Sequence, residues 1–547
     1  MVEEGRRPLR VGLLLDGERV SAWQRLAIER VRALACAELV LVVMNATPGR
    51  GGQVPLAYRL YRVLDRRLFR AKPDAFATVE IGDLLTGVPR LRVLPSLSRH
   101  CDRFSAEDLT QIRSHAPDVL IRFGFRILRG EVLRAAPLGV WSWHHGDPDR
   151  YRGGPPGFWE VMDQAPATGA ILQRLSDDLD NGLVLCRTWS LTDKLSVNRN
   201  KNRLFWTAAP FAACCLMQAH REGPDAWMAR LEQAQPPFAL YGYPLYSPQS
   251  LGWGAMAALL GPLFWRNLWR KLKEGLWREQ WFLLYRFQAG LDLSFWRFQR
   301  LIPPPDRFWA DPHVLRKDGL YWLFYEEYEY RTKRGRICCR AFDAQGQPQD
   351  PVVALERPYH LSYPQVFEYQ GEIYLVPETW QNRQVELYRA SEFPTRWELV
   401  RVLLVDIVAV DATLVFHEGR WWLFANVQET PGGSTFNELF LYSTDDLLGG
   451  EWEAHPANPI VSDVRRARPA GGLFAIDGVL YRPAQNCAGR YGSGIVINRI
   501  DRLTPDEYAE TPVQSADASF APRIGSLHTL NYANGLVVAD ARMQRLR

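Results

Sequence analysis

The second half of the chain repeats one local pattern at a spacing of roughly fifty residues. Each copy has a glycine-centred turn followed by an alternating strand rich in aromatic and β-branched residues, and another short strand precedes each turn. The five copies are Asp318–Phe324, Gln370–Val376, Glu418–Phe424, Asp477–Tyr481 and Asn534–Val538. A tight turn between two short strands is typical of a β-hairpin, and repeated hairpins are typical of propeller blades. We therefore predict an all-β five-bladed propeller over residues 291–547.

The repeats also align polar residues at positions expected near the propeller centre. Eight residues before each turn glycine stand Asp311, Tyr363, Asp411, Ala470 and Leu527, the last followed by His528. Seven residues after each turn glycine stand Glu326, Glu378, Asn426, Gln485 and Arg542. We expect a polar ring that lines the central channel or its mouth. A slip of one residue in this alignment would exchange the two faces of every strand.

The propeller half resembles two families. Phe308–Pro312 and Val410–Thr413 resemble acidic positions of five-bladed glycoside hydrolases, while Arg357–Pro364 and Pro377–Thr379 are similar to the N-terminal domain of plant glucosamine inositolphosphorylceramide transferases. Carboxylates contributed by different blades could act as the acid and base of glycoside cleavage. Alternatively, they bind a sugar or an ion, or accept backbone N–H bonds that cap the blade strands. The predicted ligand contacts here are Asp311, Glu378, Asp411 and His528.

Aromatic residues support carbohydrate binding only weakly, because strand aromatics usually belong to the core. Trp421 and Trp422 are adjacent on one predicted strand. Neighbouring strand residues point to opposite faces, so we expect only one of these two rings to be in the core.

The first half carries a different pattern, centred on a histidine. A strand-like run ends in Trp141–His145 and leads into Arg150–Gly154, and Leu179–Gly182 follows further along. Val11–Leu15 and Asp118–Ile121 read as earlier buried strands. A histidine and a distant aspartate beside a glycine-bounded loop are the parts of a proton-transfer site.

This order of a strand, x-His, Arg-aromatic-Arg-Gly, Thr168-Gly169 and Leu-Asp-x-Gly is similar to the catalytic core of the formyltransferase family, which includes methionyl-tRNA formyltransferase and the sugar N-formyltransferases. The resemblance implies a Rossmann-like α/β domain, placed at residues 8–235, and 10-formyltetrahydrofolate as the formyl donor. The family's catalytic residues fall on Ser142, His144 and Asp180. His144 would accept or relay the amine proton, and Asp180 would orient its imidazole.

The chain departs from the family pattern in two places. Ser142 stands where the family has Asn, so stabilisation of the oxyanion, worth roughly 3 kcal/mol per donor, would need a neighbour such as His145 or a changed chemistry. Gly146–Asp149 replaces the family's Ser-Leu-Leu-Pro. We expect His145, Arg152 and Gly153 to contact substrate. In the alternative interpretation, His144 and His145 only close a strand in a non-catalytic domain.

Residues 236–290 form a Trp-rich linker between the two predicted domains. The apolar stretch Leu251–Trp265 is shorter than the ~20 residues that a membrane-spanning helix needs. It continues as a basic amphipathic helix that places Trp265, Trp269, Leu272 and Leu276 on one face. This pattern favours a linker helix packed between domains, and peripheral membrane contact through residues 251–286 is the alternative.

Composition narrows the remaining choices. The 547 residues are 47% hydrophobic, enough for two to four globular domains, and 66 basic against 61 acidic residues leave a net charge of +5. Such a mild charge does not call for a nucleic-acid partner. The eight Cys show no Cys-x-x-Cys spacing, so we expect neither a metal site nor a disulfide framework. With no export signal recognised, we expect a cytoplasmic protein, or one peripheral to the inner membrane face.

Three classes of function remain. The first is transfer of a formyl group to the amine of a nucleotide- or lipid-linked amino sugar in cell-surface glycan biosynthesis, with the propeller recognising the sugar. The second is a glycoside hydrolase or glycan-processing enzyme whose site lies in the propeller, and the third is a non-catalytic glycan-binding protein. We expect the first, because both halves lead independently to carbohydrate chemistry. A tRNA substrate is disfavoured, because the charge is nearly balanced and the second half is a propeller.

Overall fold

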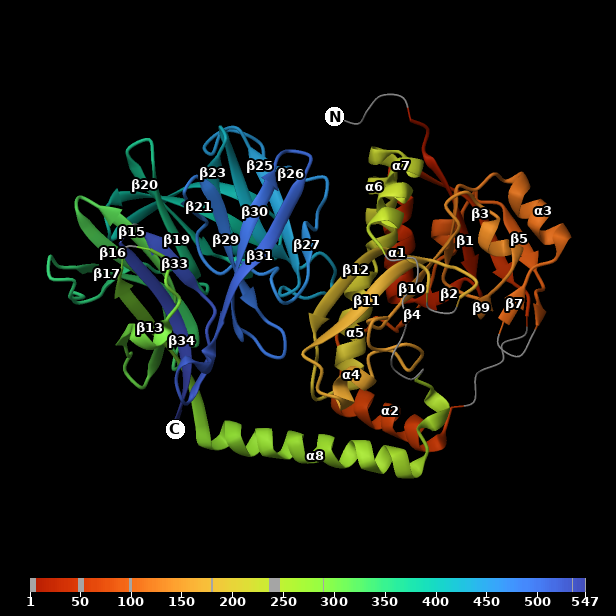
Figure 1. Ribbon diagram of the computed structural model, residues 1–547, viewed down its shortest axis with the longest axis horizontal. Coiled ribbons are helices and arrows are strands. Elements are labelled where there is room, and N and C mark those ends of the chain that lie inside the picture. The colour runs from red at the N-terminus through yellow and green to blue at the C-terminus, as the bar shows by residue number, and fades with distance from the viewer. Residues whose placement is uncertain are drawn as a thin grey trace. The chain divides into compact units, whose positions relative to one another are not determined.

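The computed structural model describes residues 6–47, 54–97, 101–178, 181–235, 246–288, 290–533 and 535–546. The chain forms two compact units, residues 1–265 with 430–433 and residues 266–429 with 434–547. Figure 1 traces the first from red to yellow-green and the second from green to blue.

A seven-stranded mixed sheet forms the centre of the first unit, with the order β12-β11-β10-β8-β1-β3-β5. Its strands are β1 (Leu9–Leu15), β3 (Ala37–Asn45), β5 (Arg90–Val93), β8 (Val119–Arg122), β10 (Val140–His144), β11 (Ala167–Arg174) and β12 (Leu183–Leu191). The strands from β10 to β5 pair in parallel, and β11 and β12 are antiparallel. Two small sheets pair β2 (Arg19–Ser21) with β4 (Thr78–Glu80), and β6 (Ser96–Leu97) and β9 (Ile127–Leu128) with β7 (Cys101–Arg103).

Helices cover both faces of the large sheet, which explains the uninterrupted apolar sequence of its strands. Leu13 faces one core cluster and Leu14 faces the other, as alternation along a strand requires. The helices of this unit are α1 (Ala22–Arg32), α2 (Leu56–Leu68), α3 (Ala106–Ser114), α4 (Trp159–Met162), α5 (Val197–Ala208), α6 (Phe211–Glu222) and α7 (Pro224–Gln233). The first cluster contains residues of α1, α5, α6 and α7, and the second contains residues of α3. The predicted α/β architecture is therefore present.

Five antiparallel sheets form the second unit within the described ranges, so the five-bladed propeller is confirmed. Blade 1 contains β15 (Arg307–Lys317), β16 (Leu320–Glu329), β17 (Arg334–Phe342) and β18 (Val352–Leu355), and blade 2 contains β19 (Ser362–Tyr369), β20 (Glu372–Glu378), β21 (Gln384–Glu392) and β22 (Arg396–Val405). Blade 3 contains β23 (Ala409–His417), β24 (Arg420–Val427), β25 (Glu438–Thr444), β26 (Glu453–Ala454) and β27 (Val461–Ser462). Blade 4 contains β28 (Phe474–Ile476), β29 (Val479–Asn486), β30 (Gly494–Leu503) and β31 (Tyr508–Asp517).

The turn in each of the first four repeats has the geometry that its glycine suggested. In blade 1, Asp318 and Gly319 have φ angles of 51° and 79°, and the corresponding pairs of blades 2 to 4 have φ between 50° and 81°. Positive φ at both central residues is the conformation of the two-residue hairpin turn that matches strand twist. The glycines by which the repeat was recognised therefore stand at positions where the backbone requires a positive φ.

The fifth blade joins strands from both ends of the propeller sequence. Its strands are β32 (Ile524–Ser526), β33 (Leu530–Ala533), β34 (Leu536–Leu546), β13 (Trp277–Phe287) and β14 (Gln299–Leu301). β13 pairs with β34 along its whole length, from Trp277 opposite Leu546 to Phe287 opposite Leu536. The sequence prediction assigned residues 277–287 to the linker, and the structure corrects that boundary.

The linker also contains helix α8 (Trp253–Leu276), which has Pro262 in its interior. Met256 and Leu263 are buried, whereas Trp265, Trp269, Leu272 and Leu276 are each more than half exposed. Across the described ranges, no helix combines the length and the apolar character needed to span a membrane.

Trp421 and Trp422 are both buried, so the prediction that only one belongs to the core was wrong. Trp421 lies in a cluster with residues of blade 2, and Trp422 lies in a cluster with residues of blade 4. A propeller blade is covered by a neighbour on each face, and both faces of β24 are therefore core.

Candidate functional site

The predicted catalytic strand, β10, lies inside the sheet of the first unit, between β8 and β11. Ser142 is buried in this strand, and His144 is its last residue, at the carboxyl end. In open α/β sheets, ligands bind beyond the carboxyl ends of the strands. His144 therefore stands where a substrate would be expected.

Ser142 contacts a cation that the sequence reasoning did not identify. The Arg122 guanidinium, at the carboxyl end of β8, donates from Nη1 to Ser142 Oγ at 2.9 Å. Its Nη2 donates to the carbonyl oxygens of Phe125 and Arg126, both at 2.9 Å. These bonds fix the guanidinium beside β10. An arginine that ends an apolar strand run was the available signal for this residue.

The loop after β10 packs closely on the His144 ring. Nε2 of His144 lies 3.2 Å from the carbonyl oxygen of Tyr151, which can only accept a hydrogen bond, so Nε2 carries the proton in this arrangement. A Cβ at Gly146 would lie 2.8 Å from that carbonyl oxygen and 3.1 Å from Nε2, and glycine is therefore required there. Asp180, the predicted partner of His144, lies outside the described residues.

The other predicted residues of this loop have different positions. His145 faces the core, where its ring stacks on Phe205 at 3.5 Å and meets Trp23 edge-on, and burial holds the pKa of His145 well below its usual value. The His145 ring therefore packs against core side chains, and its contact with substrate stays a prediction. Arg152 and Gly153 lie in a segment whose backbone pairs with Tyr246.

A buried carboxyl group close to this loop was not predicted. Glu160 in α4 is 1% exposed, and burial raises its pKa to about 8, with Asp147 and Asp163 adding to the effect. Its Oε1 atom has no hydrogen-bond partner among the described residues. Glu160 is therefore largely protonated at neutral pH and can exchange a proton there.

In the second unit, central carboxylates accept backbone N–H bonds from neighbouring blades. Asp540 Oδ2 accepts from the Asp311 amide at 2.9 Å, Asp311 Oδ2 accepts from the Tyr363 amide at 3.3 Å, and Glu378 Oε2 accepts from the Asp411 amide at 3.1 Å. Asp311, Tyr363 and Asp411 have positive φ angles of 53°, 43° and 52°, each at a shift in strand register. A bulge leaves an amide without a ladder partner, and these carboxylates supply one.

Asp411 is also held by a buried cation, Arg468. The guanidinium donates from Nε to Asp411 Oδ2 at 2.5 Å and from Nη2 to Oδ1 at 3.2 Å, while Gln485 Nε2 donates to Oδ2 at 2.8 Å. The rings of Phe436 and Tyr491 lie 5.2 and 5.1 Å from the guanidinium carbon. Two-point pairing of this kind is among the stronger charge-assisted contacts in proteins.

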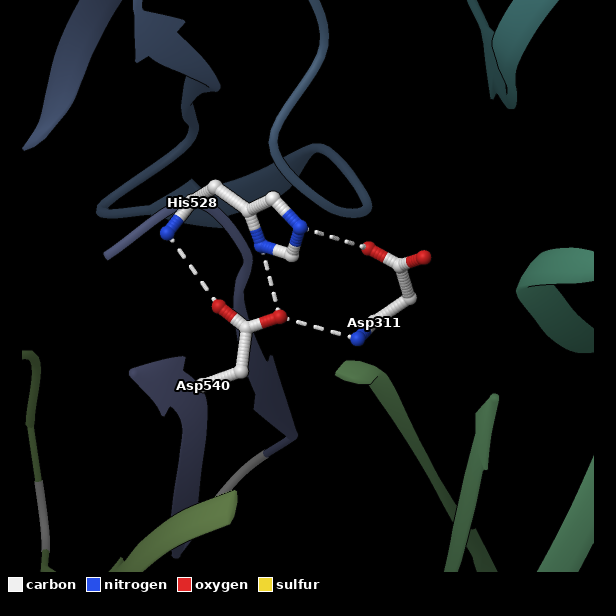
Figure 2. Close-up of side chains that lie close together, drawn as sticks. All are labelled: Asp311, His528 and Asp540. Carbon is white, nitrogen blue, oxygen red and sulfur yellow. Dashed lines mark hydrogen bonds and ion pairs between the residues drawn. The ribbon is translucent and has the colours of Figure 1, made fainter. Parts of the chain in front are cut away.

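His528 lies between two carboxylates, as Figure 2 shows. Its Nδ1 is 2.6 Å from Asp540 Oδ2 and its Nε2 is 3.6 Å from Asp311 Oδ1, and the ring stacks on Trp281 of β13 at 4.0 Å. Burial acts to lower the pKa of His528, but the carboxylates of Asp540 and Asp311 raise it above the usual value. The three residues form a buried ion-pair triad.

The same three side chains could hold a metal ion by distance alone, since their ligand atoms all lie within 4.8 Å of one another. A ligating imidazole nitrogen must be unprotonated. The 2.6 Å contact between Nδ1 and Asp540 places a proton on that nitrogen instead. With the proton on Nδ1, Nε2 is the nitrogen that faces Asp311 and would be the ligand atom of His528 for an ion.

Charges at the propeller centre come close to balance. The carboxyl groups are those of Asp311, Glu326, Glu378, Asp411 and Asp540, and the cations are those of Arg468 and His528. Burial raises the pKa of Asp311 to about 6 and the pKa values of Glu326 and Glu378 well above their usual range. When the two glutamic acids are protonated, the three aspartates remain as anions opposite the two cations, so negative and positive charge nearly cancel.

The structure brings all four predicted propeller residues, Asp311, Glu378, Asp411 and His528, into this one network. The network also contains Asp540, which was not predicted. Arg542, which the repeat alignment placed near the centre, pairs with Glu279 instead. β33 has only four residues where β15 has eleven, so the inward position of the last hairpin comes two residues earlier than the alignment predicts. A lone aspartate in the apolar run 536–541 was the signal for Asp540.

Comparison with known proteins finds partial matches. A family model described as glucosamine inositolphosphorylceramide transferase 1, N-terminal, matches residues 302–522. Glucosamine inositolphosphorylceramide transferase 1 of Oryza sativa subsp. japonica is 38% identical over 212 residues, covering 38% of this chain and 28% of that protein. Methionyl-tRNA formyltransferase of a Synechococcus strain is 29% identical over 150 residues, covering 25% of this chain and 42% of that protein.

Among solved structures, a family 117 glycoside hydrolase from Zobellia galactanivorans matches with a TM-score of 0.32 and 13% identity, covering 49% of this chain and 90% of that chain. The chain thus spans less than a third of the length of the first relative named, the rice transferase, and is similar to parts of transferases of two kinds.

Proposed function

We propose that this protein is an enzyme that transfers a formyl group from 10-formyltetrahydrofolate to the amine of an amino sugar carried on a nucleotide or a lipid. The observation that carries the proposal is the position of His144 at the carboxyl end of β10, with the Arg122 and Ser142 contact beside it. Similarity to methionyl-tRNA formyltransferases supports the same reaction class.

The reaction needs a group that removes a proton from the attacking amine. The amine nitrogen forms a bond to the formyl carbon, the bond from that carbon to N10 of the donor breaks, and N10 takes up a proton. His144 is the side chain that accepts the amine proton and can return one to N10. Because Nε2 donates to the Tyr151 carbonyl oxygen, Nδ1 takes the proton, and Asp180, which follows in the sequence, is proposed to stabilise the imidazolium that forms.

Negative charge develops on the formyl oxygen during attack, and Ser142 alone is a modest donor to it. Arg122 brings a guanidinium to within 2.9 Å of the Ser142 hydroxyl oxygen. A cation at this place can provide the stabilisation that an amide side chain provides elsewhere, worth roughly 3 kcal/mol. The residues at the end of β10 therefore fit the formyl group of the donor.

The acceptor class is supported by the names of the relatives matched by the propeller-containing half. Those proteins are glucosamine inositolphosphorylceramide transferases, and glucosamine is an amino sugar whose amine can be formylated. We propose that the propeller recognises the sugar part of such an acceptor. A tRNA acceptor fits less well, because the net charge is only +5.

The test is incubation of the purified full chain with 10-formyltetrahydrofolate and a panel of nucleotide- and lipid-linked amino sugars, with the product followed by mass. We expect gain of one formyl group, and a loss of about a thousandfold in rate for His144→Gln. His115→Gln, at the end of α3, is the matched control and should retain full activity. If no acceptor is formylated, or if His144→Gln is as fast as the parent protein, the proposal is wrong.

A further inference from the structure

Helix α2 exposes an apolar stripe that nothing in the proposed reaction uses. Leu56, Leu60, Val63, Leu64 and Leu68 are between 52% and 66% exposed. Their spacing of three and four residues places them on one side of the helix. The other side carries Tyr58, Tyr61 and Asp65, which are buried. The exposed leucines therefore form a continuous face instead of scattered single residues.

Helix α8 repeats this arrangement. Trp265, Leu268, Trp269, Leu272 and Leu276 follow the same spacing and are between 37% and 70% exposed. Met256 and Leu263, which are buried, lie on the opposite side of the helix. Each helix thus has one apolar face in contact with protein and a second one open to solvent.

The two helices meet through their buried faces. Tyr58 and Tyr61 of α2 and Met256 and Leu263 of α8 belong to one core cluster of the first unit. Figure 1 shows α2 beside the first part of α8. The exposed stripe residues of α2 are not members of this cluster, and the α8 stripe beyond Trp265 belongs to the second unit.

The charge of the two helices indicates the kind of partner that this surface would bind. Together they carry eight basic and two acidic residues, a net charge of +6, whereas the whole chain has a net charge of +5. One of the two acids, Asp65, is buried. Exposed leucine and tryptophan stripes flanked by arginine and lysine are the features of helices that lie in the interface of an anionic membrane.

We propose that α2 and α8 together form a docking surface for an anionic lipid bilayer. The apolar stripes enter the boundary between headgroups and acyl chains, and the basic side chains contact the phosphates. Two anchoring helices hold the protein more firmly than α8 alone, because both must leave the membrane before the protein dissociates. Docking places the protein beside lipid-linked acceptors and does not depend on formyl transfer.

The first experiment is cosedimentation of the full chain with vesicles of phosphatidylcholine alone and with vesicles that contain about a third phosphatidylglycerol. We expect binding about tenfold tighter to the anionic vesicles, and a loss of that difference at high salt. Equal binding to the two kinds of vesicle, or no binding to either, would overturn the proposal.

A matched pair of variants tests the surface itself. Val63→Glu changes a residue of α2 that is 66% exposed, and Val405→Glu makes the same change in β22 at a residue that is 68% exposed. We expect Val63→Glu to weaken binding to anionic vesicles about tenfold and Val405→Glu to leave it unchanged. Trp269→Glu in α8 should act like Val63→Glu, and circular dichroism checks that each variant is folded.

The same variants separate a membrane from other occupants. If Val63→Glu and Trp269→Glu bind vesicles as the parent protein does, the proposal is wrong. If they instead convert an oligomer into a monomer in light scattering without any change in vesicle binding, the surface is an interface between copies of this chain, and the proposal is again wrong.

Discussion

The two units contain the same kinds of polar residue in opposite situations. At the end of β10, the His144 ring lies beside the loop that follows the strand, with Nε2 3.2 Å from the Tyr151 carbonyl oxygen. At the propeller centre, the Asp311 carboxylate accepts bonds from the Tyr363 amide and the Thr529 hydroxyl, and the Asp411 carboxylate is held by Arg468. Carboxylates with all these internal partners hold the blades together. The comparison teaches that the bonding of a polar residue, more than its type or burial, separates a structural role from a chemical one.

The largest expected effect is on the stability of the propeller. Arg468→Met keeps most of the side-chain volume but leaves Asp411 buried without its cation, which should cost about 4 kcal/mol in free energy of unfolding. Scanning calorimetry of the propeller transition measures it. Asp406→Ala, which removes an exposed partner of Arg383, is the control and should change little. An unchanged transition in Arg468→Met would show that the central charges are not structural.

The next effect concerns Glu160, the buried acid of the first unit. Its pKa is raised from 4.5 to about 8, so the unfolded chain loses this proton before the folded one does. Stability from this group is present below pH 4.5 and is lost as the pH rises to about 8. Glu160→Gln, which stays neutral, should therefore match the parent protein near pH 4.5 and exceed it by about 4 kcal/mol near pH 8. Thermal melting at both ends of this range measures the difference, and a constant difference would contradict the prediction.

A third substitution tests whether Arg122, beside β10, acts in catalysis or has only a structural role. Arg122→Gln should lower the rate of formyl transfer about a hundredfold, because the developing negative charge loses its nearest cation. Arg122→Lys should recover part of that rate, and Arg113→Gln, on the exposed side of α3, should have no effect. Rates at saturating acceptor are compared. Equal loss in the Gln and Lys variants would point to a purely structural role for the guanidinium.

The smallest expected effect is the loss of one buried hydroxyl group from the network at the propeller centre. Thr529 donates from Oγ1 to Asp311 Oδ1 at 2.9 Å and is fully buried. Thr529→Val keeps the shape and removes this bond together with the 3.2 Å contact of Oγ1 with His528 Nδ1, so the loss of stability should be about 1.5 kcal/mol. Chemical denaturation measures it, with Thr511→Val on an exposed strand as reference. A loss as large as that of Arg468→Met would mean that the network fails as a whole.

Much of the fold followed from the sequence because backbone geometry selects particular residues. The glycines of the hairpin turns stand where φ is positive, and that requirement is visible in the chain without knowledge of its partners. β13 was missed for the opposite reason. A central strand covered on both faces reads as an uninterrupted run, here Gln280–Tyr285, and nothing in such a run identifies β34 as its partner.

The site residues also fall into those that the sequence indicated and those that it did not. His144, Asp311 and Asp411 were found because they recur in a recognisable motif or repeat. Arg468 was not, since a single arginine in sequence has the appearance of a surface residue and only packing shows that it is buried. Arg122 was missed although it ends an apolar strand run, because only the structure shows its bond to Ser142. The stacking of His145 on Phe205 was not predicted from the sequence, and its role as a substrate contact stays a prediction.

The pairing of β13 with β34 has a consequence for how the protein is made. On the ribosome, β13 emerges long before its partner, and synthesis at ~5–20 residues per second leaves it waiting for tens of seconds. Throughout that interval the nascent chain displays an apolar strand with an open edge, the kind of segment that chaperones protect from aggregation. The ring becomes a closed object only when its last strand has been translated.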